Sequence, residues 1–299
     1  MLNEVIKVEN KIKGGLYGFC IGDALGAPVE FMSKKWIKKR YGYISDYKSG
    51  FFTIPYFLKR AGTGTDDTQF MHALSNGLLK NPSDPYQSIS HEFNKLRLFP
   101  LFIGKTLLYD FFFYFGNWNA TARFVNGLLR GRTAGNGALM RTLPISFMYK
   151  SLEEIEEKSV LHARMTHWND LSNECCIVYN KIAFYLLQGK SIQEAISLSV
   201  EGTCVEDYSI EGTIPNGYCV YSLIWTIHWL LHTNSFEEAV LAAINEGGDS
   251  DTIAALVGGL AGIYYGYESI PERFLQGLKR KKKVEQLAKG FLQNIQKNT

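Results

Sequence analysis

The chain has 299 residues, of which 46% are hydrophobic and 14% aromatic, and its formal net charge is +3. This composition is ample for a large packed core and favours a globular protein. The net charge is too small to indicate a nucleic-acid-binding protein, so we expect no nucleic acid partner to be required.

Helical periodicity dominates along the chain. Apolar residues recur every three or four positions in the clearest segments, which are residues 172–187, 192–198 and 236–244. Three serines with a glutamate three positions later predict capped helix starts, namely Ser151, Ser191 and Ser235. Three glycines mark predicted helix ends, namely Gly189, Gly202 and Gly290. Alternating strand patterns are scarce, so we predict an all-α fold of about ten or more helices in one compact domain, residues 1–299.

An aromatic stretch, residues 99–118, includes a run of five aromatic side chains from Phe111 to Phe115. Core packing is the favoured interpretation of this stretch, and a platform for stacking a purine is the alternative.

Residues 1–14 mix charged and apolar side chains and lack the apolar core of a signal peptide. The longest apolar run, residues 252–265, is shorter than the roughly 20 residues of a membrane span. The five cysteines are an odd number without metal-ligand spacing, which indicates free thiols in a reducing compartment. We therefore expect a cytoplasmic protein without membrane insertion, and we expect it to be a monomer.

Two acidic motifs stand directly in front of predicted helices. The first is Thr65-Asp-Asp-Thr68, and the second is Asp249-Ser-Asp-Thr252, which follows Gly247 and Gly248. Each motif can be explained as a helix cap, because acidic side chains satisfy the free amides of a helix N-terminus. The two glycines, however, would also let the backbone approach a ligand closely.

The two motifs together carry more chemistry than either alone. Four carboxylates brought together in an apolar bundle would repel one another unless a cation offsets their charge. With Thr65 and Thr252 as further oxygen ligands, the four aspartates could hold two Mg²⁺ or Mn²⁺ ions about 4 Å apart. Zinc is disfavoured, because no cysteine or histidine falls at a suitable spacing.

Two other segments are candidates for the same site. Residues 22–31 read as a helix end and a turn that presents Glu30, in which Asp23 is either a partner of the site or a helix-internal hydrogen-bond acceptor. Residues 135–141 read as a turn leading into a helix, whose free amides could bind a phosphate.

The ordered set of these motifs resembles the ADP-ribosylglycohydrolase family, of the type that activates dinitrogenase reductase. The motifs are residues 22–26 with Glu30, then 65–68, 135–141, 166–167 and 247–252. The resemblance covers about residues 14–266, and the two aspartate motifs at this separation are specific. It implies an all-α domain whose central cleft holds two Mg²⁺ ions and an enzyme that removes ADP-ribose from its acceptors.

The resemblance also implies roles for single residues. The implied metal ligands are Thr65, Asp66, Asp67, Asp249, Asp251 and Thr252. Glu30 is implied beside the metals, and His167 near the ADP-ribose. Asn136 and the neighbouring amides, including that of Gly137, are implied near the diphosphate.

Three positions depart from the family pattern. Ser250 replaces the threonine of many relatives, which we expect to be harmless. Residues 168–172 after His167 are unlike the usual sequences there, which affects the expected contacts to the distal ribose or adenine. The aromatic and basic loop 40–60 has no assigned place in the family pattern.

Cleavage at C1 of the ribose passes through an oxocarbenium-like state that needs nearby carboxylates, a proton for the leaving acceptor and an oriented water. We predict Glu30 as the acid/base or acceptor-orienting residue, and Asp66 and Asp251 as the other catalytic residues. Two other functions remain open: an inactive protein that binds ADP-ribose, and a Mg-dependent nucleotide phosphohydrolase. Residue patterns do not distinguish arginine, serine, a nucleobase or a small molecule as the acceptor.

Two basic clusters complete the candidates. Residues 34–40 contain four lysines and Arg40 shortly after Glu30, and they could steer an acidic ligand toward the cleft. Residues 279–283, Lys-Arg-Lys-Lys-Lys, are interpreted as the solvated face of a C-terminal helix, with a nuclear targeting or nucleic-acid patch as the alternative.

Overall fold

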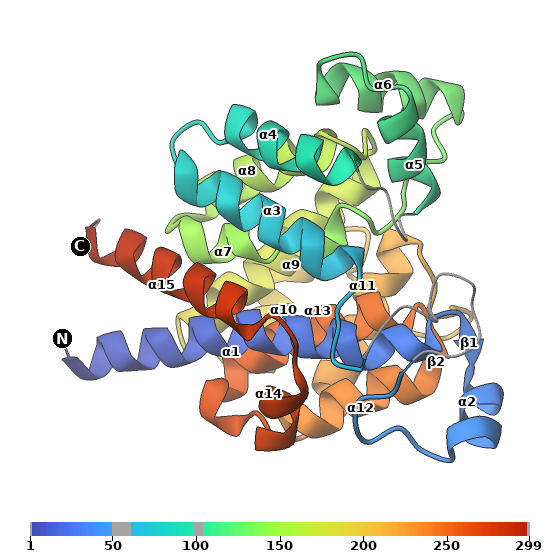
Figure 1. Cartoon of the computed structure of the whole chain (residues 1–299), viewed down its shortest axis with the longest axis vertical. Helices are drawn as coiled ribbons and strands as arrows, with labels where there is room; N and C mark the ends of the chain where they lie inside the picture. Colours follow the sequence, from blue (N-terminus) through green and yellow to red (C-terminus); the bar gives the residue numbers. More distant parts are fainter. Residues whose placement is uncertain (1, 50–60, 99–103, 298–299) are drawn as a thin grey trace.

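The computed structural model describes residues 2–49, 61–98 and 104–297 of the chain. These residues form fifteen α-helices, short 3-10 turns and one ribbon of two very short strands (Figure 1). The all-α prediction is confirmed. In the part of the chain that the structure describes, no helix has the length and apolar character to cross a membrane.

Two long helices form the centre of the fold. They are α1 (Leu2–Gly26) and α13 (Ser250–Tyr265), which run side by side (Figure 1). Every residue of α13 from Ser250 to Ile263 is buried. A Cβ atom on Gly18 would lie 2.1 Å from the carbonyl oxygen of Gly258, and one on Gly22 would lie 1.9 Å from that of Ala254. Glycine is therefore required on α1, because the two backbones touch.

The other helices surround this pair. The N-terminal half contains α2 (Lys34–Tyr41), α3 (Asp66–Lys80), α4 (Tyr86–Arg97), α5 (Lys105–Phe112), α6 (Trp118–Leu128) and α7 (Pro144–Met148). The C-terminal half contains α8 (Leu152–Arg164), α9 (Asp170–Leu187), α10 (Ile192–Val200), α11 (Cys219–Leu231), α12 (Phe236–Glu246), α14 (Glu272–Gly277) and α15 (Lys281–Lys297). The 3-10 turns are η1 (Ala27–Val29), η3 (Leu139–Arg141) and η4 (Tyr267–Ser269), and the strands are β1 (Met32–Ser33) and β2 (Gly247–Gly248).

The predicted helix starts are correct. Ser151, Ser191 and Ser235 each accept a hydrogen bond from the backbone N–H three residues later, and at Ser191 the capping box is complete. Gly189 and Gly202 follow the ends of α9 and α10 with positive φ, as predicted.

The helix end predicted at Gly290 is wrong. This residue lies inside α15, where a Cβ atom would be 2.8 Å from the side chain of Leu79. The glycine allows α15 to pack tightly on α3 and does not end the helix.

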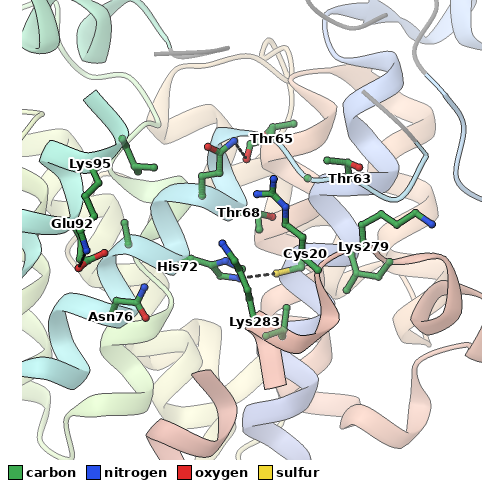
Figure 2. Close-up of a pocket in the computed structure, with 17 residues that line it drawn as sticks. Cys20, Thr63, Thr65, Thr68, His72, Asn76, Glu92, Lys95, Lys279 and Lys283 are labelled. Carbon is green, nitrogen blue, oxygen red and sulfur yellow. Dashed lines mark hydrogen bonds and ion pairs between the residues drawn. The ribbon is translucent and has the colours of Figure 1, made fainter. Parts of the chain in front are cut away.

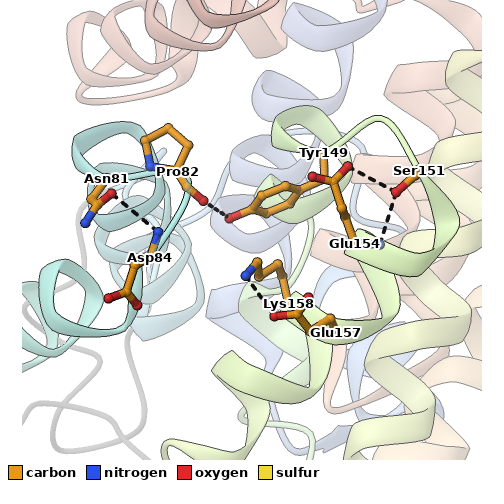
Figure 3. Close-up of polar contacts among 8 residues, drawn as sticks. All are labelled: Asn81, Pro82, Asp84, Tyr149, Ser151, Glu154, Glu157 and Lys158. Atoms are coloured by element: carbon orange, nitrogen blue, oxygen red, sulfur yellow. Dashed lines mark hydrogen bonds and ion pairs between the residues drawn. The ribbon is translucent and has the colours of Figure 1, made fainter.

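Hydrogen bonds also join segments that are distant in sequence. The hydroxyl of Tyr149, between α7 and α8, donates to the carbonyl oxygen of Pro82 at 2.8 Å (Figure 3). This bond holds the α3–α4 loop against the start of α8, where Ser151 caps the helix.

The aromatic stretch packs only in part as expected. Phe111 and Trp118 are buried, and their ring centroids lie 5.8 Å apart. Phe112 and Phe115 are 80% and 56% exposed. Residues 99–103 lie outside the described part of the chain, as do residues 50–60 of the aromatic and basic loop.

Candidate metal centre

The two acidic motifs begin two helices whose N-termini meet. Thr65 is the N-cap of α3, and its hydroxyl oxygen accepts a hydrogen bond of 3.2 Å from the backbone N–H of Asp67. The cap interpretation of Thr65 is thus confirmed. Asp249 occupies the N-cap position of α13, but its side chain makes no capping hydrogen bond. Its carboxylate is therefore available for another role.

The ribbon of β1 and β2 brings a third segment to these helix ends. The strands pair antiparallel, with Met32 opposite Gly248, and the N–H of Phe31 donates to the carbonyl oxygen of Gly248 at 2.6 Å. Because Glu30 precedes β1 and Asp249 follows β2, antiparallel pairing places these two carboxylates at the same end of the ribbon.

Gly247 and Gly248 serve this pairing. Both have positive φ, and a Cβ atom would lie 2.3 Å from the carbonyl oxygen of Met32 at Gly247 and 1.9 Å from that of Pro215 at Gly248. In this structure the close approach at both glycines is made by the protein's own backbone.

The carboxylates form one cluster. Ligand atoms of Glu30, Asp249 and Asp251 all lie within 4.8 Å of one another. Burial raises the pKa of Asp67 well above its usual value, and the carboxylates of Asp251, Asp23, Asp66 and Asp249 raise it further. Burial also raises the pKa of Asp249. The two acidic motifs are thus close enough in space to repel each other.

The cluster offers ligand atoms of the kind that could bind a divalent cation. One carboxylate oxygen of Asp67, Oδ1, is buried and has no hydrogen-bond partner among the described residues. A buried carboxylate oxygen without a partner destabilises the folded protein unless it is protonated or bound to a cation. Carboxylate and hydroxyl oxygens are the ligands that Mg²⁺ and Mn²⁺ prefer.

Asp23 holds one wall of the cluster in place. Its carboxylate accepts hydrogen bonds from the backbone N–H groups of Thr65 at 2.9 Å and Thr68 at 3.0 Å, and from the hydroxyl of Thr68. Two interpretations of Asp23 were open, and the hydrogen bonds favour the one in which it is a partner of the site. Asp23 lies on α1 and fixes the first turn of α3 against that helix.

A cavity of about 250 Å³ opens beside the cluster. The predicted site residues that line it are Glu30, Asp66, Asp67, Asn136, Gly137, His167, Asp249 and Thr252. Thr65 and Asp251 are buried at the same helix ends without lining the cavity. A neighbouring hollow shares Lys105 and Gly135 with this cavity and extends past Tyr218, Arg130 and Arg132. Residues 111–118 line neither space.

Asn136 points at the acidic cluster. Its side-chain amide donates to Asp249 Oδ2 at 2.7 Å and to Ser222 Oγ at 3.0 Å. The turn leads into the three-residue 3-10 helix η3, and α7 follows from Pro144. The backbone of the turn is held by a hydrogen bond from the N–H of Asn136 to the carbonyl oxygen of Gly217 at 2.9 Å.

Arg141 is a supporting residue to which the sequence assigned no role. Its guanidinium is fully buried between the rings of Phe70 and Phe93, 5.5 and 4.9 Å from their centroids. It donates to the carbonyl oxygen of Gly137 and, at 2.6 Å, to the hydroxyl oxygen of Thr166. One cation thus links the 135–141 turn to the segment that carries His167. In the sequence, the only signal for Arg141 is its position at the end of the 135–141 segment.

The hydrogen bonds of Thr166 define the state of His167. Thr166 Oγ1 lies 2.9 Å from His167 Nδ1, and among the described residues the hydroxyl proton has no other acceptor. Burial, together with the charge of Arg141, lowers the pKa of His167 to about 3. The imidazole is therefore neutral, with Nδ1 accepting from Thr166 and the ring proton on Nε2. His167 can act as a hydrogen-bond donor in the cavity.

Comparison with known proteins connects this geometry to a family. The family model described as ADP-ribosylglycohydrolase matches residues 4–299. ADP-ribosyl-[dinitrogen reductase] glycohydrolase of Rhodospirillum rubrum is 30% identical over 92% of each chain. ADP-ribosylarginine hydrolase Tri1 of Serratia proteamaculans is 27% identical over 93% of this chain and 78% of its own.

A solved structure supports the same relationship. The structure titled "ADP-ribosylglycohydrolase-related protein complex" superposes with a TM-score of 0.80 at 25% identity, covering 97% of this chain and 99% of its own. The chain belongs to the ADP-ribosylglycohydrolase family.

Proposed function

We propose that the protein is a Mg-dependent hydrolase that cleaves the glycosidic bond between ADP-ribose and an acceptor and releases ADP-ribose. The observation that carries this proposal is the meeting of the α3 and α13 carboxylates with Glu30 beside a cavity. Family membership supports the reaction class.

Two Mg²⁺ ions, or Mn²⁺ in their place, would be held by Thr65, Asp66, Asp67, Asp249, Asp251 and Thr252. When bound, the ions would supply positive charge for the ribose hydroxyls and the diphosphate. The buried carboxylates would then be ionised, because the cations offset the repulsion that raises their pKa values.

The chain's own residues supply the remaining functions. Glu30 is only partly buried, and it lies at the edge of the cluster, where it can orient water or pass a proton to the leaving acceptor. Neutral His167 can donate from Nε2 to an acceptor oxygen of the bound ADP-ribose. The hollow beyond Gly135, with Arg130, Arg132 and Tyr218 in its wall, offers room for the adenosine end of the ligand. In the overall reaction, water adds to C1 of the ribose and the acceptor leaves with a proton.

Arginine is the acceptor that we propose first. The Tri1 relatives, named as ADP-ribosylarginine hydrolases, cover 93% of this chain, whereas the ADP-ribosylhydrolase ARH3 of Homo sapiens covers 55%. An acidic cleft edge that includes Glu30 would also suit a cationic guanidinium leaving group. We further propose that the protein acts as a cytoplasmic monomer, which its five free cysteines support for the compartment.

The test is product analysis with arginine-linked, serine-linked and nucleic-acid-linked ADP-ribose, each with Mg²⁺ and with EDTA. Release of free ADP-ribose only with Mg²⁺ supports the proposal, and the preferred substrate identifies the acceptor. Binding of ADP-ribose without turnover would instead support an inactive binding protein. Release of phosphate from nucleotides would support a phosphohydrolase.

A further inference from the structure

A second cavity, of about 200 Å³, lies on a different face of α3 from the acidic cluster. Thr65, Thr68, Gln69, His72 and Asn76 line it from that helix and its cap (Figure 2). Asp66 and Asp67 belong to the metal centre, so the two cavities are separated by the first turn of α3. Nothing in the proposed hydrolase reaction uses the second one.

The wall of this cavity is strongly basic. The cationic side chains that line it are Lys95, Lys279, Arg280 and Lys283, and the acidic one is Glu92. Glu92 is already paired with Lys95 at 2.6 Å. Among the described residues, Lys279, Arg280 and Lys283 form no ion pair. Three cationic side chains without an ion pair therefore line this hollow from exposed positions. In Figure 2 the side chain of Lys279 extends away from Thr68 and His72.

The backbone of the basic turn is anchored to the loop before α3. The N–H of Lys279 donates to the carbonyl oxygen of Gly62 at 2.8 Å, which fastens the turn before α15 to the loop that leads into α3. Gly62 has a positive φ, and a Cβ atom there would lie 2.0 Å from the carbonyl oxygen of Gly277. Arg280 has a φ of 57°, which is uncommon for a residue other than glycine. The conformation of the basic turn, Lys279 and Arg280, is thus fixed by backbone contacts.

The position of the charges along α15 adds a second argument. Positive side chains at a helix N-terminus are unfavourable, because the helix dipole is positive there. Lys281, Lys282 and Lys283 nevertheless form the first turn of α15, directly after Lys279 and Arg280. A bound anion would relieve both the repulsion among these side chains and their conflict with the dipole.

His72 forms the floor of the cavity. Its Nε2 lies 3.9 Å from the thiol sulfur of Cys20, so this ring nitrogen has only a weak partner (Figure 2). Burial, together with the charges of Lys283 and Arg280, lowers the pKa of His72 to about 4. The His72 imidazole therefore lies in the positive potential of Lys283 and Arg280, which would also attract an anion.

We propose that this cavity binds a phosphate group, either as inorganic phosphate or as a small phosphomonoester. Lysine and arginine provide the charge-assisted hydrogen bonds that phosphate oxygens accept. The volume is below the roughly 300 to 1,000 Å³ of sites for drug-sized ligands, so the occupant is small. Residues 279–283 are exposed, as the interpretation of a solvated face predicts, and Lys279, Arg280 and Lys283 also line this cavity.

The proposal can be tested with the full chain in EDTA at constant ionic strength, which keeps divalent ions out of the acidic cluster. Inorganic phosphate and glycerol 3-phosphate are titrated separately, with chloride as the comparison anion. Thermal unfolding and calorimetry measure binding, and the NMR signals of the His72 imidazole, assigned with a His72→Gln variant, report its location.

Three variants distinguish this cavity from other anion sites. Lys283→Gln removes a cation from its wall, and Lys282→Gln is a matched control because Lys282 is exposed on the same turn without lining the cavity. Lys105→Gln removes a cation from the cavity beside the acidic cluster.

We expect saturable binding that shifts the His72 signals and that Lys283→Gln weakens roughly tenfold or more, whereas Lys282→Gln and Lys105→Gln change it little. A stronger effect of glycerol 3-phosphate than of phosphate would identify a phosphomonoester as the ligand. Absence of saturable binding, or binding that Lys105→Gln abolishes and Lys283→Gln retains, would overturn the proposal.

Discussion

The side-chain amide of Asn136 donates a hydrogen bond of 2.7 Å to Asp249, and this contact joins the 135–141 turn to the acidic cluster. The same amide also donates to Ser222. The family resemblance places Asn136 near a diphosphate. Asn136 thus also orients Asp249, a carboxylate of the proposed metal centre. This hydrogen bond favours the ionised form of Asp249 and lowers its pKa against the effect of burial.

Replacing Asn136 by leucine should weaken metal binding. The variant keeps a similar volume but removes the donor, so Asp249 is less well oriented and holds its proton more strongly. We expect Mg²⁺ affinity, measured by calorimetry, to fall roughly 10- to 100-fold, as for other residues that orient metal ligands. Ser222→Ala is the matched control, because it leaves the bond to Asp249 intact. Equal losses in both variants would contradict the role given to this hydrogen bond.

Metal removal should expose the repulsion within the acidic cluster. Asp67 and Asp249 have folded-state pKa values above those of the unfolded chain, so the metal-free protein is stabilised when they are protonated and loses that stability as the pH rises above about 4. In EDTA we expect the Tm to be lower at pH 8 than at pH 5. Mg²⁺ should restore more stability at pH 8 than at pH 5. Thermal unfolding with matched ionic strength checks this, and a larger Mg²⁺ effect at pH 5 would speak against it.

Asp110 offers an independent pH test away from the cluster. Burial raises its pKa to about 9, and Arg141 only partly opposes this shift. Neither carboxylate oxygen has a hydrogen-bond partner among the described residues. Its protonated form therefore favours folding, and stability is lost as the pH rises from about 4 toward 9. Asp110→Asn should change the Tm little at pH 4 and raise it increasingly up to pH 8. A lower Tm than wild type at pH 8 would instead reveal a stabilising ion pair with Arg141.

Gly137 tests the position of His167. A Cβ atom at Gly137 would lie 2.8 Å from Cε1 of this imidazole. Gly137→Ala should displace the ring and reduce ADP-ribose affinity, measured by calorimetry, roughly tenfold or more. Gly127→Ala is the control, since its Cβ would meet nothing within 4 Å and alanine favours the helix by about 0.5 to 1 kcal/mol. Unchanged affinity in Gly137→Ala would mean that His167 does not contact the ligand.

Local patterns in the sequence were enough to predict the all-α class and several helix starts. Capping at Ser191 and the helix start after Thr65 depend on residues three or four positions apart, so spacing alone indicates them. Gly290 shows the limit of this approach. A glycine that ends a helix and one that admits a neighbouring helix look alike in the sequence, and only the contact with Leu79 separates them.

Long-range contacts account for what the sequence did not show. The bond from Thr65 to Asp23 spans 42 residues, and the two-residue strands β1 and β2 are too short for an alternating pattern. Arg141 reads as an ordinary polar residue until Phe70 and Phe93 enclose it. The basic cavity likewise requires α3, α4 and the turn before α15 to come together. Each of these features depends on tertiary packing, which residue spacing does not specify.

The central claim is that the acidic cluster performs Mg-dependent release of ADP-ribose. The most direct measurement is the rate of free ADP-ribose release from an arginine-linked substrate by wild type and by Asp251→Ala, with helix content followed by circular dichroism. We predict that wild type releases ADP-ribose with Mg²⁺ and not with EDTA, and that Asp251→Ala abolishes release while its helix content stays nearly unchanged. An Asp251→Ala protein that cleaves the substrate at the wild-type rate would contradict the account.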